Sequence, residues 1–197
     1  MKRLVLVAVL TTFCFTATQA QVEFGVKGGL NIANLNGDDA DELDPNSRTS
    51  FNFGAVVGIS VSDNFSVQPE VLFSGQGATV DSDEGEATFK LNYINVPVLA
   101  SFEVTDGLSL QAGPQLGINI GDDLEFDGQS ESTEAESIDF GAAFGAQYQL
   151  ANGLLFQARY AVGLSDVYKE DGQEIDVKNG VLSFSIGYMF GGSGGDN

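Results

Sequence analysis

The sequence predicts an all-β fold, an eight-stranded antiparallel up-and-down transmembrane β-barrel. Three observations support this prediction. Apolar and polar residues alternate with period two in segments of about ten residues or more, as expected for strands with two different faces. Short turns alternate with long acidic connections, which is the pattern of membrane barrels. No helical period and no long apolar run follow the N-terminal segment, so spanning helices are not expected.

Residues 1–20 have the features of a secretory signal peptide. Lys2 and Arg3 precede an apolar run at 4–15, and a small-residue site ends at Ala20, where we expect cleavage. The run is too short and wrongly flanked for a membrane-spanning helix. The only cysteine, Cys14, lies within this segment. The mature protein should therefore contain no disulfide and no thiol chemistry.

The remaining chain divides into a barrel domain, 21–190, and a flexible Gly-rich tail, 191–197. The alternating segments place strands near 22–32, 51–62, 65–77, 89–104, 108–119, 138–150, 154–166 and 180–190. Residues with turn chemistry predict tight turns at 63–64, 105–107 and 151–153. Longer acidic loops are expected near 33–50, 78–88, 120–137 and 167–179.

The fourth strand does not keep all its apolar residues on one face. Its apolar residues fall on opposite faces in the two halves of the strand: Phe89, Leu91 and Tyr93 in the first, Val96, Val98 and Phe102 in the second. A β-bulge near Ile94 or Asn95 would bring both sets to the same face. We therefore expect a bulge there.

Alternation alone does not separate a membrane barrel from a secreted soluble barrel, which is the alternative. The polar faces carry Gly, Gln, Ser and Asn with few charges, which suits a crowded barrel interior and not a soluble surface. Aromatic residues are placed as two interfacial girdles. These are Phe24, Phe65, Phe102, Tyr148, Phe156 and Phe190 near the short turns, and Phe51, Phe53, Phe73 and Phe140 near the long loops.

With a signal peptide, such strands indicate the outer membrane of a gram-negative cell. An even number of strands places both termini on the periplasmic side and the acidic loops outside the cell. The expected partners are outer-membrane lipid and lipopolysaccharide, the barrel-assembly machinery during biogenesis, and envelope or secretion partners. We expect a monomer. The net charge of −20 disfavours nucleic acid as a partner.

The sequence does not predict an enzyme, a cofactor or a defined metal site. Histidine, the commonest general base and metal ligand, is absent. Outer-membrane lipid hydrolases and acyltransferases that would be comparable use a Ser and His pair. Ser165 lies in GLSDV (163–167), but without the strand-turn-helix setting of a nucleophile elbow.

Arg159 lies in the middle of the apolar strand LLFQARYAVGL (154–164). On the lipid face an arginine at mid-depth would cost about 2 to 4 kcal/mol, so we place it in the interior. Lys27 and Glu70 should reach a similar height, each about five residues from the periplasmic end of its strand at roughly 3.3 Å per residue. We expect an ionic cluster of Lys27, Glu70 and Arg159, structural in role, with Gln68, Gln111, Gln157 and Asn95 as hydrogen-bonding neighbours. The alternative role is a gate or a narrow proton or ion path.

The third loop contains a weak match to a calcium-binding pattern. Asp123, Glu125, Asp127 and Glu134 follow the spacing of an EF-hand loop, with Gly128 at the expected turn position. The third ligand position is Glu, no helices flank the loop, and Ser130 replaces the usual apolar residue. A solvated acidic loop is therefore the preferred interpretation, and a specific cation site is the alternative.

Several strands resemble the PorT-like outer-membrane β-barrel family of Bacteroidetes. The similar segments are GVKGGLNIANL (25–35), VQPEVLFSGQG (67–77), YINVPVLASF (93–102), LQAGPQLG (110–117), DFGAAFGAQYQL (139–150) and LLFQARYAVGLSDV (154–167). The resemblance implies an eight-stranded barrel, and the family takes its name from a protein needed for secretion. The chain departs from the family because GGSGGDN follows Phe190, the final aromatic.

Two functions follow from these observations. The first is a structural or interaction barrel, with a side-chain-filled polar interior, that presents acidic surface loops. The second is a transport or secretion-system accessory, which either conducts small solutes or docks to a larger machine. Eight strands leave an interior just filled by side chains, which favours the first.

Overall fold

A computed structural model describes residues 21–41, 45–82, 85–126, 129–133, 135–168 and 176–190. The expected signal peptide, its cleavage site and the Gly-rich tail lie outside these residues. The described helix α2, Asp38–Asp41, has four residues. No helix in the described part of the chain is long and apolar enough to cross a membrane.

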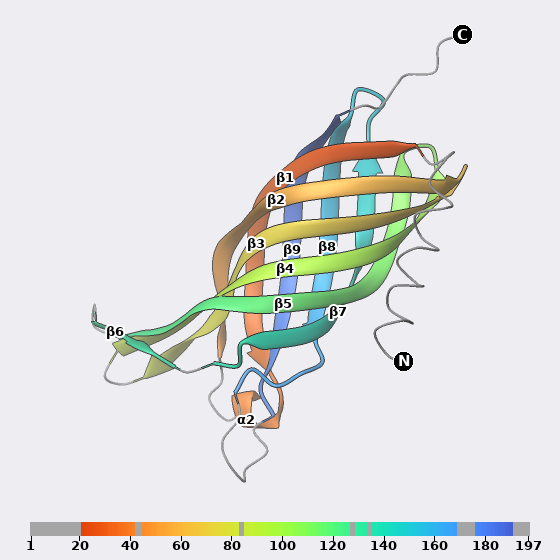
Figure 1. Ribbon diagram of the computed structural model, residues 1–197. Coiled ribbons are helices and arrows are strands. Elements are labelled where there is room, and N and C mark those ends of the chain that lie inside the picture. Colours follow the sequence, from red (N-terminus) through yellow and green to blue (C-terminus); the bar gives the residue numbers. More distant parts are fainter. Residues whose placement is uncertain are drawn as a thin grey trace, which may run out of the picture.

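Eight antiparallel strands form a closed ring (Figure 1). They are β1 (Val22–Asn36), β2 (Asn46–Ser62), β3 (Phe65–Ser82), β4 (Gly85–Thr105), β5 (Leu108–Phe126), β7 (Ile138–Gln149), β8 (Leu154–Gly163) and β9 (Lys178–Phe190). Each strand pairs with its neighbour in the chain, and β1 pairs with β9 to close the ring. A further short strand, β6 (Gln129–Ser132), pairs only with the end of β5. The predicted fold and order of strands are confirmed.

The two ends of the barrel differ in their connections (Figure 1). At one end, the short-turn end, β2–β3, β4–β5 and β7–β8 are joined by tight turns, and both β1 and β9 have their chain-terminal ends there. Gly107 and Gly153 occupy two of these turns with φ of 76° and 89°, a conformation that favours glycine. The opposite end, the long-loop end, carries α2 and β6.

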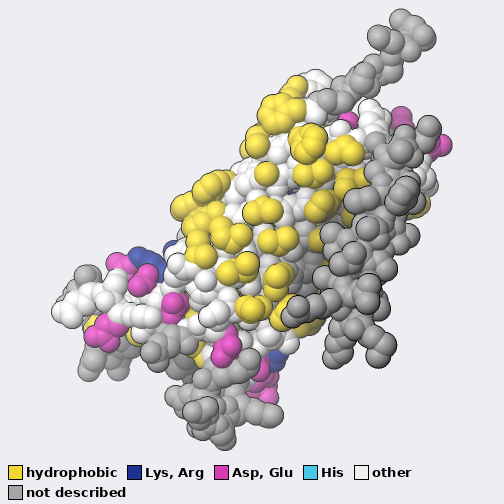
Figure 2. Space-filling model, viewed as in Figure 1, with side chains coloured by type: hydrophobic (Ala, Val, Ile, Leu, Met, Phe, Trp, Pro, Cys, Tyr) yellow, Lys and Arg dark blue, Asp and Glu magenta, His cyan; other side chains and the backbone are white. Residues whose placement is uncertain are grey.

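The barrel is apolar outside and polar inside. Along β8, Phe156, Ala158 and Tyr160 are exposed on the outer wall, whereas Gln157 and Arg159 are buried. Figure 2 shows hydrophobic side chains spread over the wall and acidic side chains toward the ends. A soluble barrel would have the reverse arrangement, because its apolar face must be buried. The outer wall is therefore built to contact lipid.

Aromatic residues cover the outer wall at both predicted girdle levels. Phe24, Phe102 and Phe190 are exposed near the short-turn end. Toward the long-loop end, Phe53 and Phe73 stack with ring centroids 5.3 Å apart. Phe51 stacks on the same pair. Such aromatic bands suit the two interfaces of a bilayer.

The predicted bulge at Ile94 or Asn95 is wrong. The register between β3 and β4 is unbroken from Leu72 to Ser82 of β3, and the buried side chains of β4 alternate without interruption from Leu91 through Tyr93 to Ser101. Leu91 and Tyr93 thus face the interior. They need no lipid contact, because they pack into an apolar cluster inside the long-loop end.

An irregularity does occur nearby, but on the neighbouring strand. Asn92 pairs with Gly121 and Tyr93 pairs with Asn119, so β5 carries the extra residue, Ile120. This bulge bends the outer part of β5, which continues into the β5–β6 hairpin.

The strands also extend much further than predicted at the long-loop end. The expected loop 78–88 is largely a hairpin in which β3 and β4 pair as far as Ser82 and Gly85. Residues 120–126 likewise belong to β5. Water surrounds both faces of a hairpin beyond the lipid, so its sequence need not alternate. Pairing still satisfies its backbone groups, which explains why these strands lack the sequence signal.

Candidate functional site

Three ionisable side chains meet in the interior of the barrel. Glu70 of β3 accepts hydrogen bonds from Nη1 and Nη2 of Arg159, each at 2.7 Å, on its two oxygens. Lys27 of β1 donates to Oε2 of the same carboxylate at 2.8 Å. The exposed fractions of the Lys27, Glu70 and Arg159 side chains are 1%, 0% and 5%. We call these three residues the ionic triad.

Glycine residues on neighbouring strands make room for the two long cations. Gly187 of β9 lies opposite Lys27, and Gly145 of β7 lies opposite Arg159. A Cβ at Gly187 would lie 2.7 Å from the Lys27 Cβ, and one at Gly145 would lie 2.8 Å from the Arg159 Cα. The alternation of small and large residues therefore lets both cations extend across the lumen to β3.

A layer of four glutamines lies beside the triad toward the short-turn end. The members are Gln68, Gln111, Gln147 and Gln157, and we call them the glutamine layer. Gln157 accepts from Lys27 at 2.6 Å and donates to Gln111 at 2.8 Å. Gln68 donates to Glu70 at 2.8 Å and to Gln147 at 3.2 Å. The layer thus links the triad to four strands.

The sequence argument did not include Gln147 in this set. Its partner in the register is Gln157 on β8, and both side chains are 5% exposed. The signal was present, because Gln147 lies on the polar face of its strand. Its level along the barrel axis, next to Gln157, follows only from the register between β7 and β8.

Asparagine and serine side chains fill the lumen on the other side of the triad. Asn31 donates to Ser74 at 2.9 Å and accepts from Asn52 at 2.7 Å and from Ser183 at 2.9 Å. Asn95 was predicted to be a hydrogen-bonding neighbour of the triad, but its Oδ1 is buried with no hydrogen-bond partner. A cavity of about 20 Å³ is the space left at this level.

An apolar plug closes the interior at the long-loop end. Its described members are Leu35, Ala40, Ala78, Leu91, Tyr93, Val167 and Val177. The Tyr93 hydroxyl accepts a hydrogen bond from Asn179 at 3.3 Å, and Asn179 also donates to Asp139 at 3.0 Å. This part of the lumen is therefore packed like a small protein core, although Asn179 Oδ1 is buried without a hydrogen-bond partner.

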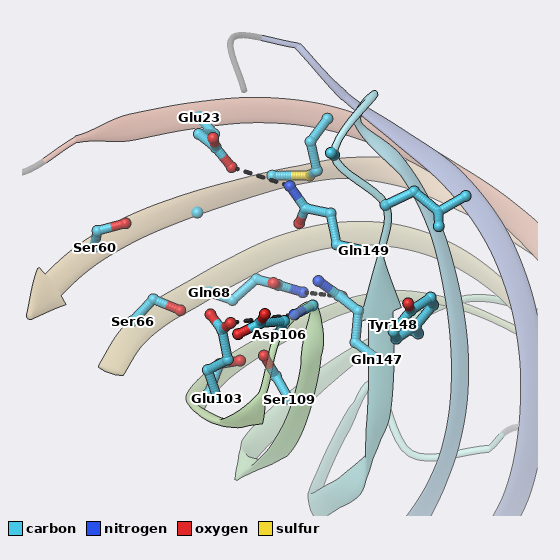
Figure 3. A pocket seen from close by; sticks show the side chains of 16 residues that line it. Glu23, Ser60, Ser66, Gln68, Glu103, Asp106, Ser109, Gln147, Tyr148 and Gln149 are labelled. Carbon is cyan, nitrogen blue, oxygen red and sulfur yellow. Dashed lines mark hydrogen bonds between the residues drawn. The ribbon is translucent and has the colours of Figure 1, made fainter. Parts of the chain in front are cut away.

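The short-turn end, in contrast, is open (Figure 3). A polar vestibule of about 700 Å³ lies there, and the residues around it include Glu23, Ser60, Ser66, Glu103, Asp106 and Ser109. Gln68 and Gln147 of the glutamine layer also line it. The vestibule thus ends at the glutamine layer and does not continue past the triad as an open channel.

The predicted cation-binding loop is only partly described. Asp123 and Glu125 belong to β5, paired with Ser132 and Ser130 of β6 in extended conformation. Glu125 forms an ion pair with Lys90. Asp127 and Glu134 lie outside the described residues, and those that are described contain no group of three His, Cys, Asp or Glu side chains arranged to hold a metal.

Ser165 has a structural environment. Its Oγ donates to Asp139 at 2.8 Å and accepts from the backbone N–H of Phe140 at the same distance. These bonds fasten the chain after β8 to the start of β7. The hydroxyl is thus held between a carboxylate and a backbone amide.

The triad generates a prediction about stability. Replacing Glu70 with Ala leaves two buried cations without their carboxylate, so the free energy of unfolding should fall by about 3 to 5 kcal/mol. Urea unfolding in lipid vesicles measures it. The matched control is Glu125→Ala, which removes a half-exposed carboxylate paired with Lys90 and should cost no more than about 1 kcal/mol. Equal stability of Glu70→Ala and the parent would contradict the structural role of the triad.

Two solved outer-membrane proteins have a similar fold. Neisserial surface protein A (NspA) matches with a TM-score of 0.58 and 16% sequence identity, over 86% of this chain and 99% of NspA. Ail, the attachment invasion locus protein of Yersinia pestis, was solved in complex with the heparin analogue sucrose octasulfate. It matches with a TM-score of 0.50 and 18% identity, over 86% of this chain and 99% of Ail. At these identities the likeness shows the fold alone.

Sequence comparison identifies the family. No curated protein sequence matches the chain. The profile of the family described as "Outer membrane protein beta-barrel domain" matches residues 17–169, well over half of the chain. The strands and the apolar outer wall of this chain agree with that match. The chain therefore belongs to the outer membrane protein beta-barrel domain family and is an integral outer-membrane β-barrel protein.

Proposed function

We propose that this protein is a closed structural and interaction barrel, which spans the outer membrane and presents acidic hairpins at the cell surface. The observation that carries the proposal is the sequence of layers in the lumen. From the short-turn end these are the glutamine layer, the ionic triad and the apolar plug. The interior serves to hold the wall together, and the protein acts through its surfaces.

The closed lumen argues against solute transport. At the level next to the triad, the free space is about 20 Å³, roughly enough for one water-sized molecule. The triad side chains are bound to each other and to the glutamine layer. A hydrated solute would have to break these bonds. The same geometry makes the triad a poor candidate for a gate at rest.

The long-loop end supports a role in surface interaction. β3, β4, β5 and β6 extend there as hairpins (Figure 1). Two of its cations are paired, Lys90 with Glu125 and Lys178 with Asp166 and Asp176. Hydrogen bonding from Lys178 lowers the pKa of Asp176, which keeps that carboxylate charged. Further carboxylates, including Asp81 and Glu131, are exposed. This end thus presents net negative charge.

The negative charge of this end suggests which partners it can bind. Cations held between acidic side chains and lipopolysaccharide phosphates would anchor the hairpins, while the barrel-assembly machinery would insert the chain. The polyanion bound by Ail in its crystal structure is a poor model for a ligand here, because like charges repel. We further propose a PorT-like ancestry, a monomeric state and no enzymatic activity. The resemblance of the strands and the absence of histidine support the first and the last.

A secretion or transport accessory is the second candidate. The vestibule of about 700 Å³ at the short-turn end favours it, because a recess of this size can receive a segment of another envelope protein. In that case the barrel docks to a larger machine without conducting solutes. Co-purification of a stable partner would favour this function over the first.

Planar-bilayer recording distinguishes a closed barrel from a pore. The purified protein should insert without producing steady solute-sized currents, because the triad and the plug fill the lumen. A general porin in the same bilayer provides the positive control, and protein-free bilayers provide the baseline. Steady solute-sized currents from the parent protein would contradict the proposal.

We also propose that the short-turn end, with both termini, faces the periplasm. The mature chain contains no cysteine if the expected leader is removed, so single cysteines can report orientation. Ser130→Cys on β6 should react with a membrane-impermeant maleimide on intact cells. Asn152→Cys in the β7–β8 turn is the matched variant and should react only after lysis. The reverse pattern of labelling would show the opposite orientation.

A further inference from the structure

The ionic triad carries an unbalanced positive charge. Lys27 and Arg159 are two cations, and Glu70 is a single carboxylate. Among the described residues, no other carboxylate lies within ion-pair distance of either cation. An uncompensated buried charge is costly, so the excess is relieved either by loss of a proton from the triad or by a further negative charge close to it. The excess is notable in a chain whose net charge is −20.

Two polar groups next to the triad are buried without partners. Both terminal nitrogens of Arg159 bind Glu70, but its Nε has no hydrogen-bond partner. Oδ1 of Asn95 is likewise buried without a hydrogen-bond partner. Both residues are 5% exposed. Because the oxygen and nitrogen of an asparagine amide can be interchanged by a flip, Asn95 can also offer an N–H donor here.

Both residues line the same small cavity, of about 20 Å³. Among the described residues, Lys27 and Arg159 are the charged side chains that line it, and Glu70 does not line it. Ser183 and Ser185 also line it, but their hydroxyl groups already donate to Asn31 and Asn52, so the Arg159 Nε–H is the unused donor. The cavity therefore has positive charge and hydrogen-bond donors around it and no carboxylate.

We propose that this cavity binds one monovalent, halide-sized anion. The charge of such an ion balances the triad, and the Arg159 Nε–H is free to donate to it. A cation would be repelled by Lys27 and Arg159, and sulfate or phosphate is too large for a space that accommodates about one water-sized particle. Water would satisfy the hydrogen bonds but leave the charge excess.

Diffraction from crystals of the full barrel grown in sodium bromide tests the site directly. An anomalous difference peak should appear between the Arg159 guanidinium and the Asn95 amide, and growth in sodium fluoride should give none. Absence of a bromide peak in the cavity, with ordinary water density instead, would overturn the proposal.

Stability measurements test the same site in solution. At constant ionic strength, the unfolding midpoint should rise with bromide or chloride relative to gluconate, since a ligand that binds only the folded state stabilises it as its concentration grows. Lys27→Met should abolish this dependence, because it leaves Glu70 and Arg159 as a balanced pair. Lys90→Met is the matched control, since it removes a lysine whose side chain is 36% exposed, and it should retain the dependence.

A second variant guards against failure of Lys27→Met to fold. Asn95→Leu fills the cavity without changing any charge, and it should also remove the halide dependence. An equal halide response in the parent, in Lys27→Met and in Asn95→Leu would place the anion elsewhere and overturn the proposal. So would a parent barrel whose unfolding midpoint is the same in bromide and in gluconate.

Discussion

Glu70 is buried in the lumen, and its bonds to Lys27 and Arg159 connect three strands that are not neighbours in the ring, β3, β1 and β8. At this level the barrel fills its lumen with the polar inner faces of its strands. Buried polar groups are tolerated when their hydrogen bonds are met, and buried charges when they are paired. The two cations can therefore lie inside only because this carboxylate lies between them.

The layers around the triad extend the same constraint along the axis. The glutamine layer adds one hydrogen bond to Lys27 and one to Glu70, and it forms the end of the vestibule. Beyond the triad the interior becomes apolar, where Leu91 and Tyr93 pack in the plug. The fold thus leaves no wide path between its two ends. The surfaces at those ends, acidic hairpins on one side and a polar recess on the other, are the parts available for interaction.

Much of the fold followed from the sequence, because the lipid imposes a period of two on every spanning strand. The same rule made Arg159 informative, since its strand neighbours Phe156 and Tyr160 had to face lipid. The bulge expected in β4 was wrong because Leu91 and Tyr93 are apolar but face inward. The alternation of a strand does not show whether its apolar residues pack inside the barrel or contact lipid. Gln147 was missed because the height of a side chain along the barrel axis depends on the register between strands, which the sequence of one strand does not reveal. The outer hairpins were predicted as loops because strand pairing beyond the lipid also depends on that register.

A double-mutant cycle between Glu70 and Arg159 tests the central claim most directly. The free energies of unfolding of Glu70→Gln, Arg159→Met and the double variant are measured by urea titration in lipid vesicles. If the bidentate pair organises the interior, the double variant should be more stable than the sum of the single effects predicts, by about 2 kcal/mol or more. Effects that add within about 0.5 kcal/mol would show that the two residues do not depend on each other and would contradict the account.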